Sequence, residues 1–244
     1  MSVDHSAPVG ATRASSVYYS DDLATLHHGD AWELLATFAD KSFDLTLTDP
    51  PYNAINQNNV VGGMRSFDKG SADSLPVDIP TLTRELARVT SGSIYVWCSH
   101  EQVSHYVDAF REHGRTTRVG VWQKTNPSPM HGEKFWLSAT ELCVFAHGPS
   151  AYFDRFCKRP VWTGPTAKDA RHPTPKPVWL MQELVQASCA PGGTVFDPFA
   201  GSGSTLVAAK NNGRRAVGIE LDEAYCRVVA DRLAQDVLDF GGAA

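Results

Sequence analysis

Short apolar runs alternate with amphipathic stretches along most of the chain, and this alternation is typical of a mostly parallel sheet flanked by helices. The runs that we interpret as strands are 26–28, 43–48, 93–98, 118–123, 141–146, 194–196 and 215–219. The stretches that we interpret as helices are 32–38, 81–89, 101–113, 177–190, 204–212 and 222–238. The pattern therefore predicts a single α/β domain over residues 21–244, preceded by a flexible leader over residues 1–20.

Two segments interrupt this periodicity, and both are rich in residues that favour loops. Residues 53–80 contain many Gly, Asn and Ser, and residues 148–175 contain many Pro, Arg and Lys. Long irregular segments in a compact domain usually form binding loops or lids. Because 244 residues suit one α/β domain and no linker or repeat divides them, we expect insertions rather than a second domain.

Composition narrows the class of protein further. A hydrophobic content of 42% with 20% charged residues is enough to bury a core. No apolar run is long enough to span a bilayer, and the first residues do not resemble a secretory signal. The five cysteines are scattered without a C-x-x-C pair, which argues against a zinc site or a disulfide framework. We expect a cytoplasmic protein without a metal and without a membrane partner.

The charge is unevenly distributed. The net charge is −5, yet residues 124–176 hold eight basic and only four acidic residues. A face that binds phosphates on an otherwise acidic protein would have this distribution. An ordinary solvated surface explains it equally well, so charge alone does not identify a nucleic-acid partner.

The first candidate site follows the expected strand 43–48, in the sequence Thr48-Asp49-Pro50-Pro51-Tyr52. Open α/β sheets bind ligands at the carboxyl ends of their strands, and two consecutive prolines stiffen the turn there. Such a turn would aim the Asp49 carboxylate, the Pro50 carbonyl and the Tyr52 ring at one point. Two acceptors would make an exocyclic base amine more nucleophilic, and an aromatic ring would hold a flipped base. A strand-ending turn with a capping Asp is the simpler alternative.

The second candidate site is a glycine-containing turn between the strand 194–196 and the helix 204–212. Its sequence is Asp197-Pro-Phe199-Ala-Gly201-Ser-Gly203, and glycines in such a turn let a ligand approach the backbone closely. Glu220 ends the next strand, where a carboxylate suits a ribose diol. A third glycine at the dinucleotide spacing and a G-K-[ST] sequence are missing, which argues against NAD and ATP.

The third candidate segment is His172-Pro-Thr174-Pro-Lys176-Pro, at the start of an expected helix. The ammonium group of Lys176 suits a ligand carboxylate. A Pro-rich helix entry with a solvated lysine is the alternative, and this segment alone does not decide between them.

Together the three segments resemble the beta class of DNA amino-methyltransferases, which act on N6 of adenine or N4 of cytosine. The turn at residues 48–52, called here the acidic proline turn, precedes the turn at residues 197–203, called here the glycine turn. Residues 172–177 lie just before the glycine turn, and this is the order of motifs in that class. The resemblance covers about residues 26–238. It implies a circularly permuted, Rossmann-like class I fold for S-adenosylmethionine-dependent methyl transfer. The family's sheet has seven strands, mostly parallel, with one antiparallel strand.

The resemblance also implies a role for each motif residue. Asp49 and Pro50 would accept hydrogen bonds from the target amine, within the rigid turn that includes Pro51, and Tyr52 would stack on the flipped base. The cofactor, S-adenosylmethionine, would be held by residues of several segments: Asp30 at the adenine amine, Glu220 at the ribose hydroxyls, Asp197 at the methionine ammonium, Thr174 and Lys176 at the methionine carboxylate, and Phe199, Gly201 and Gly203 in the glycine turn. No metal is implied.

The chain departs from the family in the size of its target-recognition insert, which here occupies only about residues 148–171. We therefore expect recognition of the target to be shared among segments near 53–80, 126–138 and 148–172, to involve a second subunit, or to be modest. Side chains that suit contacts with DNA are those of His131, Lys134, Arg155, Lys158, Arg159 and Arg171. The aromatic rings of Trp136 and Trp162 suit either stacking on DNA or packing in the core.

The resulting hypothesis is site-specific methylation of the adenine N6 amine in double-stranded DNA, by direct transfer without a covalent enzyme intermediate. Asp rather than Ser at position 49 favours adenine, and N4 of cytosine is the main alternative. Methylation of RNA or of a protein amide is disfavoured by the permuted order of motifs. A non-catalytic DNA-binding module is disfavoured by the intact motifs. A homodimer and a cognate restriction endonuclease are further partners that the family suggests.

Overall fold

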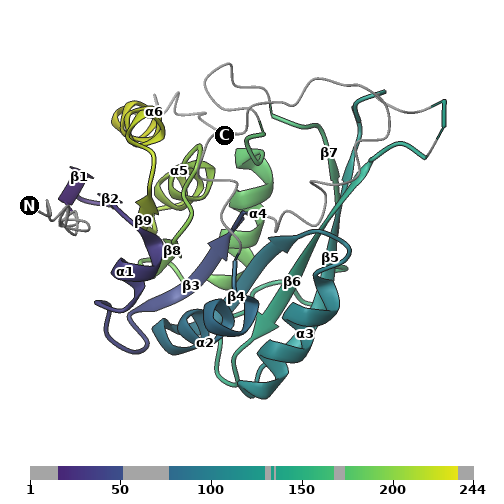
Figure 1. Ribbon diagram of the computed structural model, residues 1–244, viewed down its shortest axis with the longest axis horizontal. Coiled ribbons are helices and arrows are strands. Elements are labelled where there is room, and N and C mark those ends of the chain that lie inside the picture. The colour runs from purple at the N-terminus through teal and green to yellow at the C-terminus, as the bar shows by residue number, and fades with distance from the viewer. Residues whose placement is uncertain (1–15, 52–76, 130–132, 135, 168–173, 236–244) are drawn as a thin grey trace, which may run out of the picture.

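The computed structural model describes residues 16–51, 77–129, 133–134, 136–167 and 174–235 (Figure 1). All strands of this part of the chain belong to one sheet in the order β1-β2-β9-β8-β3-β4-β6-β5-β7. Their bounds are β1 Ser16–Ser20, β2 Ala24–His28, β3 Phe43–Thr48, β4 Thr90–Cys98, β5 Thr116–Lys124, β6 Thr140–His147, β7 Val161–Gly164, β8 Thr194–Asp197 and β9 Arg215–Glu220.

The seven central strands of this sheet confirm the expected fold class; in spatial order they are β2, β9, β8, β3, β4, β6 and β5. Strands β2, β9, β8, β3 and β4 run parallel to one another, and β6 is antiparallel to both β4 and β5. The central part is therefore a mostly parallel sheet with one antiparallel strand. The predicted strand at 43–48 matches β3, and the other predicted strands lie within the observed ones.

The prediction of seven strands was wrong in number, because the described residues form nine. Strand β1 pairs antiparallel with β2 and lies within residues 1–20, where we expected a flexible leader. Its side chains are exposed or half-buried, and its run of strand-forming residues, Val17 to Tyr19, is too short to predict a strand by itself. Strand β7 has only 4 residues and pairs with β5 inside the Pro-rich segment. Both additions are edge strands, whose pairing depends on a neighbour rather than on their own burial pattern.

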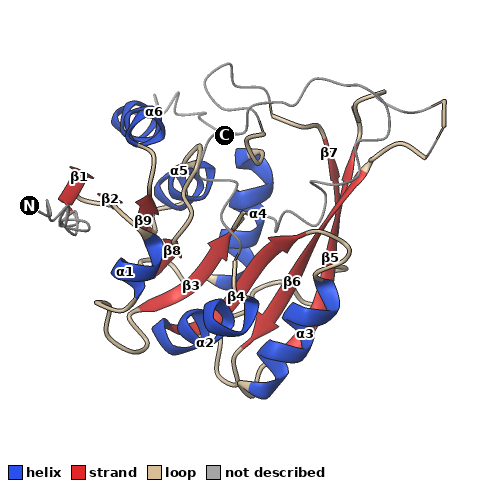
Figure 2. Ribbon diagram, in the orientation of Figure 1, coloured by secondary structure: helices blue, strands red, loops and turns tan. Residues whose placement is uncertain are grey.

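Helices cover both faces of the sheet (Figure 2). Their bounds are α1 Ala31–Leu35, α2 Ile79–Val89, α3 Val103–Glu112, α4 Val178–Ser188, α5 Ser204–Asn211 and α6 Glu223–Ala234. Apolar residues of the first three helices form one core cluster with Phe43, Ile94 and Phe196 of the sheet. Those of the last three form a second cluster with Leu45, Leu47 and Trp97. The sheet is thus buried between two helical layers, as its apolar strands require.

The helix starts follow from local sequence. Asp30, Asp78 and Asp222 cap α1, α2 and α6 by accepting hydrogen bonds from backbone amides of the first turn. Pro177 lies at the N-cap of α4, where its missing amide hydrogen costs no helical bond. Helix α5 instead begins after Gly203, whose φ of 75° lies in the left-handed region. The N-terminus of α5 therefore lies at the edge of the sheet where ligands are expected to bind.

The chain reverses its direction of winding between β8 and β3. From β3 it passes through α2 to β4 on one side, and from β8 it passes through α5 to β9 on the other side. Ligands of open α/β sheets bind beside the carboxyl ends of the strands at such a switch point. Thr48 ends β3 and Asp197 ends β8, and the Thr48 hydroxyl donates to the Asp197 carboxylate at 2.7 Å. The fold therefore brings the acidic proline turn and the glycine turn together.

Candidate active site

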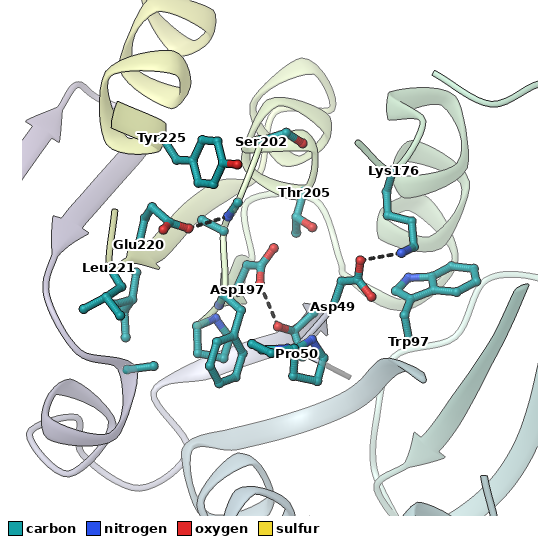
Figure 3. Close-up of a pocket in the computed structure, with 18 of the residues that line it drawn as sticks. Asp49, Pro50, Trp97, Lys176, Asp197, Ser202, Thr205, Glu220, Leu221 and Tyr225 are labelled. Atoms are coloured by element: carbon teal, nitrogen blue, oxygen red, sulfur yellow. Dashed lines mark hydrogen bonds and ion pairs between the residues drawn. The ribbon is translucent and has the colours of Figure 1, made fainter. Parts of the chain in front are cut away.

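A pocket opens at this switch point, and segments far apart in the chain line it (Figure 3). Of the site residues expected from the sequence, those that line the pocket are Asp30, Asp49, Pro50, Pro51, Thr174, Lys176, Asp197, Phe199, Gly201 and Glu220. Gly203 is not among the lining residues, since it shapes the glycine turn from behind. Tyr52 lies outside the described residues. Ser202, Ser204 and Thr205 also line the pocket, at the start of α5.

The Asp49 carboxylate projects into the pocket directly after β3. Its side chain is 32% exposed, and the following Pro50 is buried. Because Thr48 is buried and anchored to Asp197, the backbone that carries Asp49 is fixed on both sides. Asp49 is therefore a pre-positioned hydrogen-bond acceptor at the pocket wall.

Lys176 lies between two carboxylates in this structure. Its Nζ forms a short ion pair with Asp49 Oδ2 and a second one, at 3.2 Å, with Glu141 Oε2 (Figure 3). Burial would lower the pKa of Lys176, but the charges of Asp49 and Glu141 outweigh it and raise that pKa. We expected Lys176 to face a ligand carboxylate; in the structure its ammonium also pairs with two carboxylates of the protein.

Glu141 is a site residue that our sequence reasoning missed. It is the second residue of β6, and its Oε1 accepts from Lys124 Nζ at 2.8 Å. Burial would raise the pKa of Glu141, but Lys176 and Lys124 outweigh it and lower that pKa. The available signal was a carboxylate at the start of an otherwise apolar strand, Glu141-Leu-Cys-Val-Phe-Ala146. That signal is weak, since strand ends often carry charged residues on the solvent side.

Trp97 of β4 forms the wall beside this ion-pair cluster. Its ring is fully buried, with Lys176 Nζ at 5.5 Å from the ring centroid. Trp122 packs edge-on against Trp97 at 6.5 Å, and Lys124 Nζ lies 5.6 Å from the Trp122 ring. Each cation is therefore stabilised by an aromatic face as well as by a carboxylate.

The glycine turn holds Asp197 deep in the opposite wall. Asp197 is 3% exposed and accepts from the Thr48 hydroxyl and, at 3.1 Å, from the Phe199 amide. Burial raises the pKa of Asp197 to about 6, against the opposing effect of the Thr48 and Thr205 hydroxyls. A buried carboxylate of this kind is suited to a cationic ligand group, which would supply the missing countercharge.

Glu220 ends β9 and closes the turn from the other side. Its Oε2 accepts from the Gly201 amide at 2.7 Å and its Oε1 from the Asp222 amide at 2.8 Å. Burial raises the pKa of Glu220 to about 7. Gly203 is held in its left-handed conformation against Val229, where a Cβ would lie only 2.8 Å from a Val229 methyl. These contacts fix the shape of the turn before any ligand arrives.

The remaining end of the pocket lies between α1 and α6. The Asp30 carboxylate caps α1 through the amides of Trp32, at 2.7 Å, and Glu33, at 3.3 Å. Trp32 packs edge-on against Phe199, and Leu221 and Tyr225 complete the wall. Sequence reasoning had not singled out Trp32, Leu221 or Tyr225, because single aromatic and apolar residues carry no motif. This end combines flat apolar surfaces with a carboxylate, which suits a heteroaromatic ring.

The residues considered for contacts with DNA differ in their surroundings. Arg155 is tied to Glu183 at 3.2 Å. The Trp162 ring packs against Gly120, so core packing, one of its two expected roles, is the one observed. Trp136 is 99% exposed, and Lys134, Lys158 and Arg159 are exposed as well. His131 and Arg171 lie outside the described residues.

The pocket fits the chemical groups of S-adenosylmethionine. Buried Asp197 suits an ammonium, Glu220 suits a diol, and the surfaces of Trp32, Phe199 and Leu221 suit an adenine ring. Within the described ranges, no group of three or more His, Cys, Asp or Glu side chains could hold a metal ion. In the same part of the chain, every helix is too short or too polar to cross a membrane.

Sheet order, switch point and pocket together define a circularly permuted class I methyltransferase fold. Comparison with known proteins agrees: the family model for DNA methylases matches residues 43–231. The chain therefore belongs to the N6/N4 DNA methylase family. It is accordingly a DNA methyltransferase whose cofactor is S-adenosylmethionine.

Individual relatives match nearly the whole chain. The type II methyltransferase M2.LlaDCHI of Lactococcus lactis subsp. cremoris is 29% identical over 253 residues, which cover 92% of this chain and 94% of the relative. Among solved structures, a complex of M1.HpyAVI with S-adenosylmethionine has a TM-score of 0.67 at 24% identity. The superposition covers 87% of this chain and 100% of the M1.HpyAVI chain. The cytosine-N4-specific PvuII DNA methyltransferase has a TM-score of 0.70 at 15% identity, with coverages of 91% and 90%. These structures show the shared fold.

Proposed function

We propose that this protein transfers a methyl group from S-adenosylmethionine to the N6 amine of adenine in double-stranded DNA. The observation that carries the proposal is the bond between Thr48 and Asp197, which joins the acidic proline turn to the cofactor turn at one pocket. An amine held by the first turn would thus lie beside a methyl donor held by the second. Placing two reactants in this way removes much of the entropic barrier to transfer.

The cofactor end of the pocket would be formed by the carboxylates and the glycine turn. Asp197 would bind the methionine ammonium, Glu220 the ribose hydroxyls and Asp30 the adenine amine. Thr174 and Lys176 would bind the methionine carboxylate, with Phe199, Gly201 and Gly203 shaping the turn. When bound, S-adenosylmethionine supplies an electrophilic methyl group on a positively charged sulfur.

The catalytic end would be formed by Asp49, Pro50, Pro51 and Tyr52. The Asp49 carboxylate and the Pro50 carbonyl would accept the two amine hydrogens, and Tyr52 would stack on the base. Hydrogen bonding to both acceptors withdraws the nitrogen lone pair from the ring and aims it at the methyl group. The chain needs no covalent intermediate for this step. Asp49 would also stabilise the positive charge that develops on the nitrogen.

The choice between adenine and cytosine rests on position 49. Asp in place of Ser at the first position of the turn favours N6 of adenine. The likeness to the PvuII enzyme, which is cytosine-N4-specific by name, makes N4 of cytosine the second candidate. Both amines would use the same acceptors, so the proposal for adenine is separate from the assignment to the family.

The chain would act as one methyltransferase domain over residues 21–244. Segments near 53–80, 126–138 and 148–172 would contact the DNA around the pocket. The short length of the last segment makes a homodimer a reasonable arrangement for reading a target, and a cognate restriction endonuclease would explain the need for site-specific methylation. A cytoplasmic location is consistent with access to DNA.

Analysis of methylated nucleosides tests this proposal. Plasmid DNA from a methylation-deficient bacterial host would be incubated with the purified protein and S-adenosylmethionine, digested and analysed by mass spectrometry. N6-methyladenine supports the proposal. Detection of N4-methylcytosine instead would show that the target base is cytosine and not adenine. If no new methylated base is detected, the proposed function is refuted.

A further inference from the structure

A row of four alternating charges begins at the proposed catalytic turn, and three of its members, Asp49, Lys176 and Glu141, line the pocket. Asp49 pairs with Lys176, Lys176 pairs with Glu141 at 3.2 Å, and Glu141 pairs with Lys124 at 2.8 Å. The four side chains come from four different segments: the turn after β3, the segment before α4, and the facing ends of β6 and β5. Their side chains are 12% to 32% exposed, so the row is largely shielded from water.

This row poses a problem for the proposed reaction. Asp49 must accept a hydrogen bond from the target amine, but in the structure its Oδ2 is bonded to Lys176. The ammonium and the amine would share one carboxylate, and the ion pair with Lys176 offsets the negative charge that makes Asp49 a strong acceptor. A largely buried ammonium cannot leave one anion unless another is close by, because an unpaired buried charge costs several kcal/mol.

Glu141 supplies such an anion within the protein, in addition to the cofactor carboxylate proposed above for Lys176. It already contacts Lys176 Nζ, so the ammonium can shift from Asp49 toward Glu141 without leaving the range of a counter-ion. Lys124 binds the other oxygen of Glu141 and holds this carboxylate in place during the shift. The Trp97 ring, whose centroid lies 5.5 Å from Lys176 Nζ, also stabilises the cation.

We propose that Glu141 is a positioning residue, which takes over Lys176 as a counter-ion and thereby releases the Asp49 carboxylate to the target amine. This inference rests on the proposed methyl transfer and assigns to it a residue outside the three sequence motifs. Glu141 itself touches neither the amine nor the cofactor; it acts through Lys176.

The substitution Glu141→Gln tests the inference, because it removes the charge and keeps the size of the side chain. Of the two protein carboxylates that pair with Lys176, only Asp49 would then remain charged, so the ammonium would stay closer to the acceptor that the amine needs. The expected result is a fall in kcat of about 10- to 100-fold, the rate equivalent of one charge-assisted hydrogen bond. KM for DNA and the calorimetric Kd for S-adenosylmethionine should stay within about threefold of the wild-type values. A change of about threefold corresponds to less than half of the free energy of one such bond.

Three further variants make the test specific. Glu141→Asp keeps the charge and should recover part of the lost kcat, whereas Lys124→Gln should lower kcat in the same direction by a smaller factor. The matched control is Glu85→Gln on α2, which breaks an equally half-buried ion pair, with Arg88 at 2.9 Å, away from the pocket. This control should retain the wild-type kcat.

The outcomes separate the inference from the function on which it rests. If the wild-type protein methylates DNA and Glu141→Gln keeps its kcat, the inference is wrong and the function stands. If Glu141→Gln weakens cofactor binding by as large a factor as it lowers kcat, and also lowers the melting temperature, the residue is only structural and the inference is again wrong. If Glu141→Gln does not fold, the kcat of Lys124→Gln decides in the same way. If the wild-type protein transfers no methyl group, the proposed function fails first.

Discussion

Three of the carboxyl groups that line the pocket, those of Asp49, Asp197 and Glu220, differ in their electrostatic surroundings. Asp49 is partly exposed and paired with a cation, whereas Asp197 and Glu220 are buried and accept only from hydroxyl or amide donors among the bonds described above. Burial raises the pKa of Asp197 to about 6 and that of Glu220 to about 7. Among the described residues, the pocket thus has one end with paired charges, proposed to be catalytic, and another end, proposed to bind the cofactor, whose two carboxylates accept from hydroxyl and amide donors.

Replacing Asp49 by alanine should separate catalysis from cofactor binding. The variant loses the acceptor for the amine, so we expect kcat to fall by at least about 100- to 1000-fold, as for loss of one pre-positioned transition-state contact. The calorimetric Kd for S-adenosylmethionine should not increase, because the cofactor carboxylates remain. Glu112→Ala, an exposed carboxylate at the end of α3, serves as the control. Full activity of the Asp49 variant would contradict the assigned role.

Cofactor affinity should decrease as the pH falls. Below about pH 7 Glu220 becomes neutral, and below about pH 6 Asp197 becomes neutral. A neutral Asp197 no longer attracts an ammonium, and each group can weaken binding by up to about tenfold per pH unit below its pKa. Calorimetry between about pH 8 and pH 5.5 should show this decrease. The Asp197→Asn variant should bind S-adenosylmethionine weakly and should lose the part of the pH dependence that lies below about pH 6. A wild-type affinity that does not change with pH would contradict the roles of both carboxylates.

At the scale of elements, the start of α5 carries the geometry of the glycine turn. Gly203 and Gly213 both have positive φ, 75° and 64°, but they differ in their surroundings. A Cβ on Gly203 would lie 2.8 Å from Val229 of α6, whereas a Cβ on Gly213 would meet nothing within 4 Å. The turn that is proposed to support the cofactor is therefore also a packing contact with α6.

This difference predicts unequal effects of two alanine substitutions. Gly213→Ala should lower the free energy of unfolding by about 1–2 kcal/mol, the cost of a left-handed residue with a Cβ. Gly203→Ala adds overpacking, so its loss should be about 2–5 kcal/mol. Only Gly203→Ala should also weaken cofactor binding. Urea unfolding and calorimetry measure both quantities; equal losses, or unchanged cofactor affinity in Gly203→Ala, would contradict this view of the turn.

The sequence was informative wherever an element has its own apolar pattern. Strand β3 was predicted correctly in its bounds, because burial on both faces leaves a local signal. The described residues of the three motifs lie in or beside one pocket, while their individual roles remain predictions. Strands β1 and β7 were missed, since an edge strand is stabilised by its neighbour. Glu141 was missed for a related reason: its importance depends on Lys176, 35 positions away in the sequence, and no local pattern records that pairing.

At the scale of the whole molecule, the sheet joins the two ends of the pocket. The switch point between β8 and β3 is a property of strand order, and it places two turns that are 148 positions apart in the sequence, at Asp49 and Asp197, beside each other. Helices on the two faces then close the pocket from opposite sides, with α1 at the cofactor end and α4 beside Lys176 (Figure 3). Catalysis by this chain requires that both turns face one bound cofactor.

A crystal structure of the protein with S-adenosylmethionine tests that requirement most directly. The account predicts the methionine ammonium at Asp197, the ribose hydroxyls at Glu220, and the methyl group directed toward Asp49 and Pro50. A cofactor bound elsewhere, or bound in this pocket with its methyl group directed away from Asp49, would contradict the account.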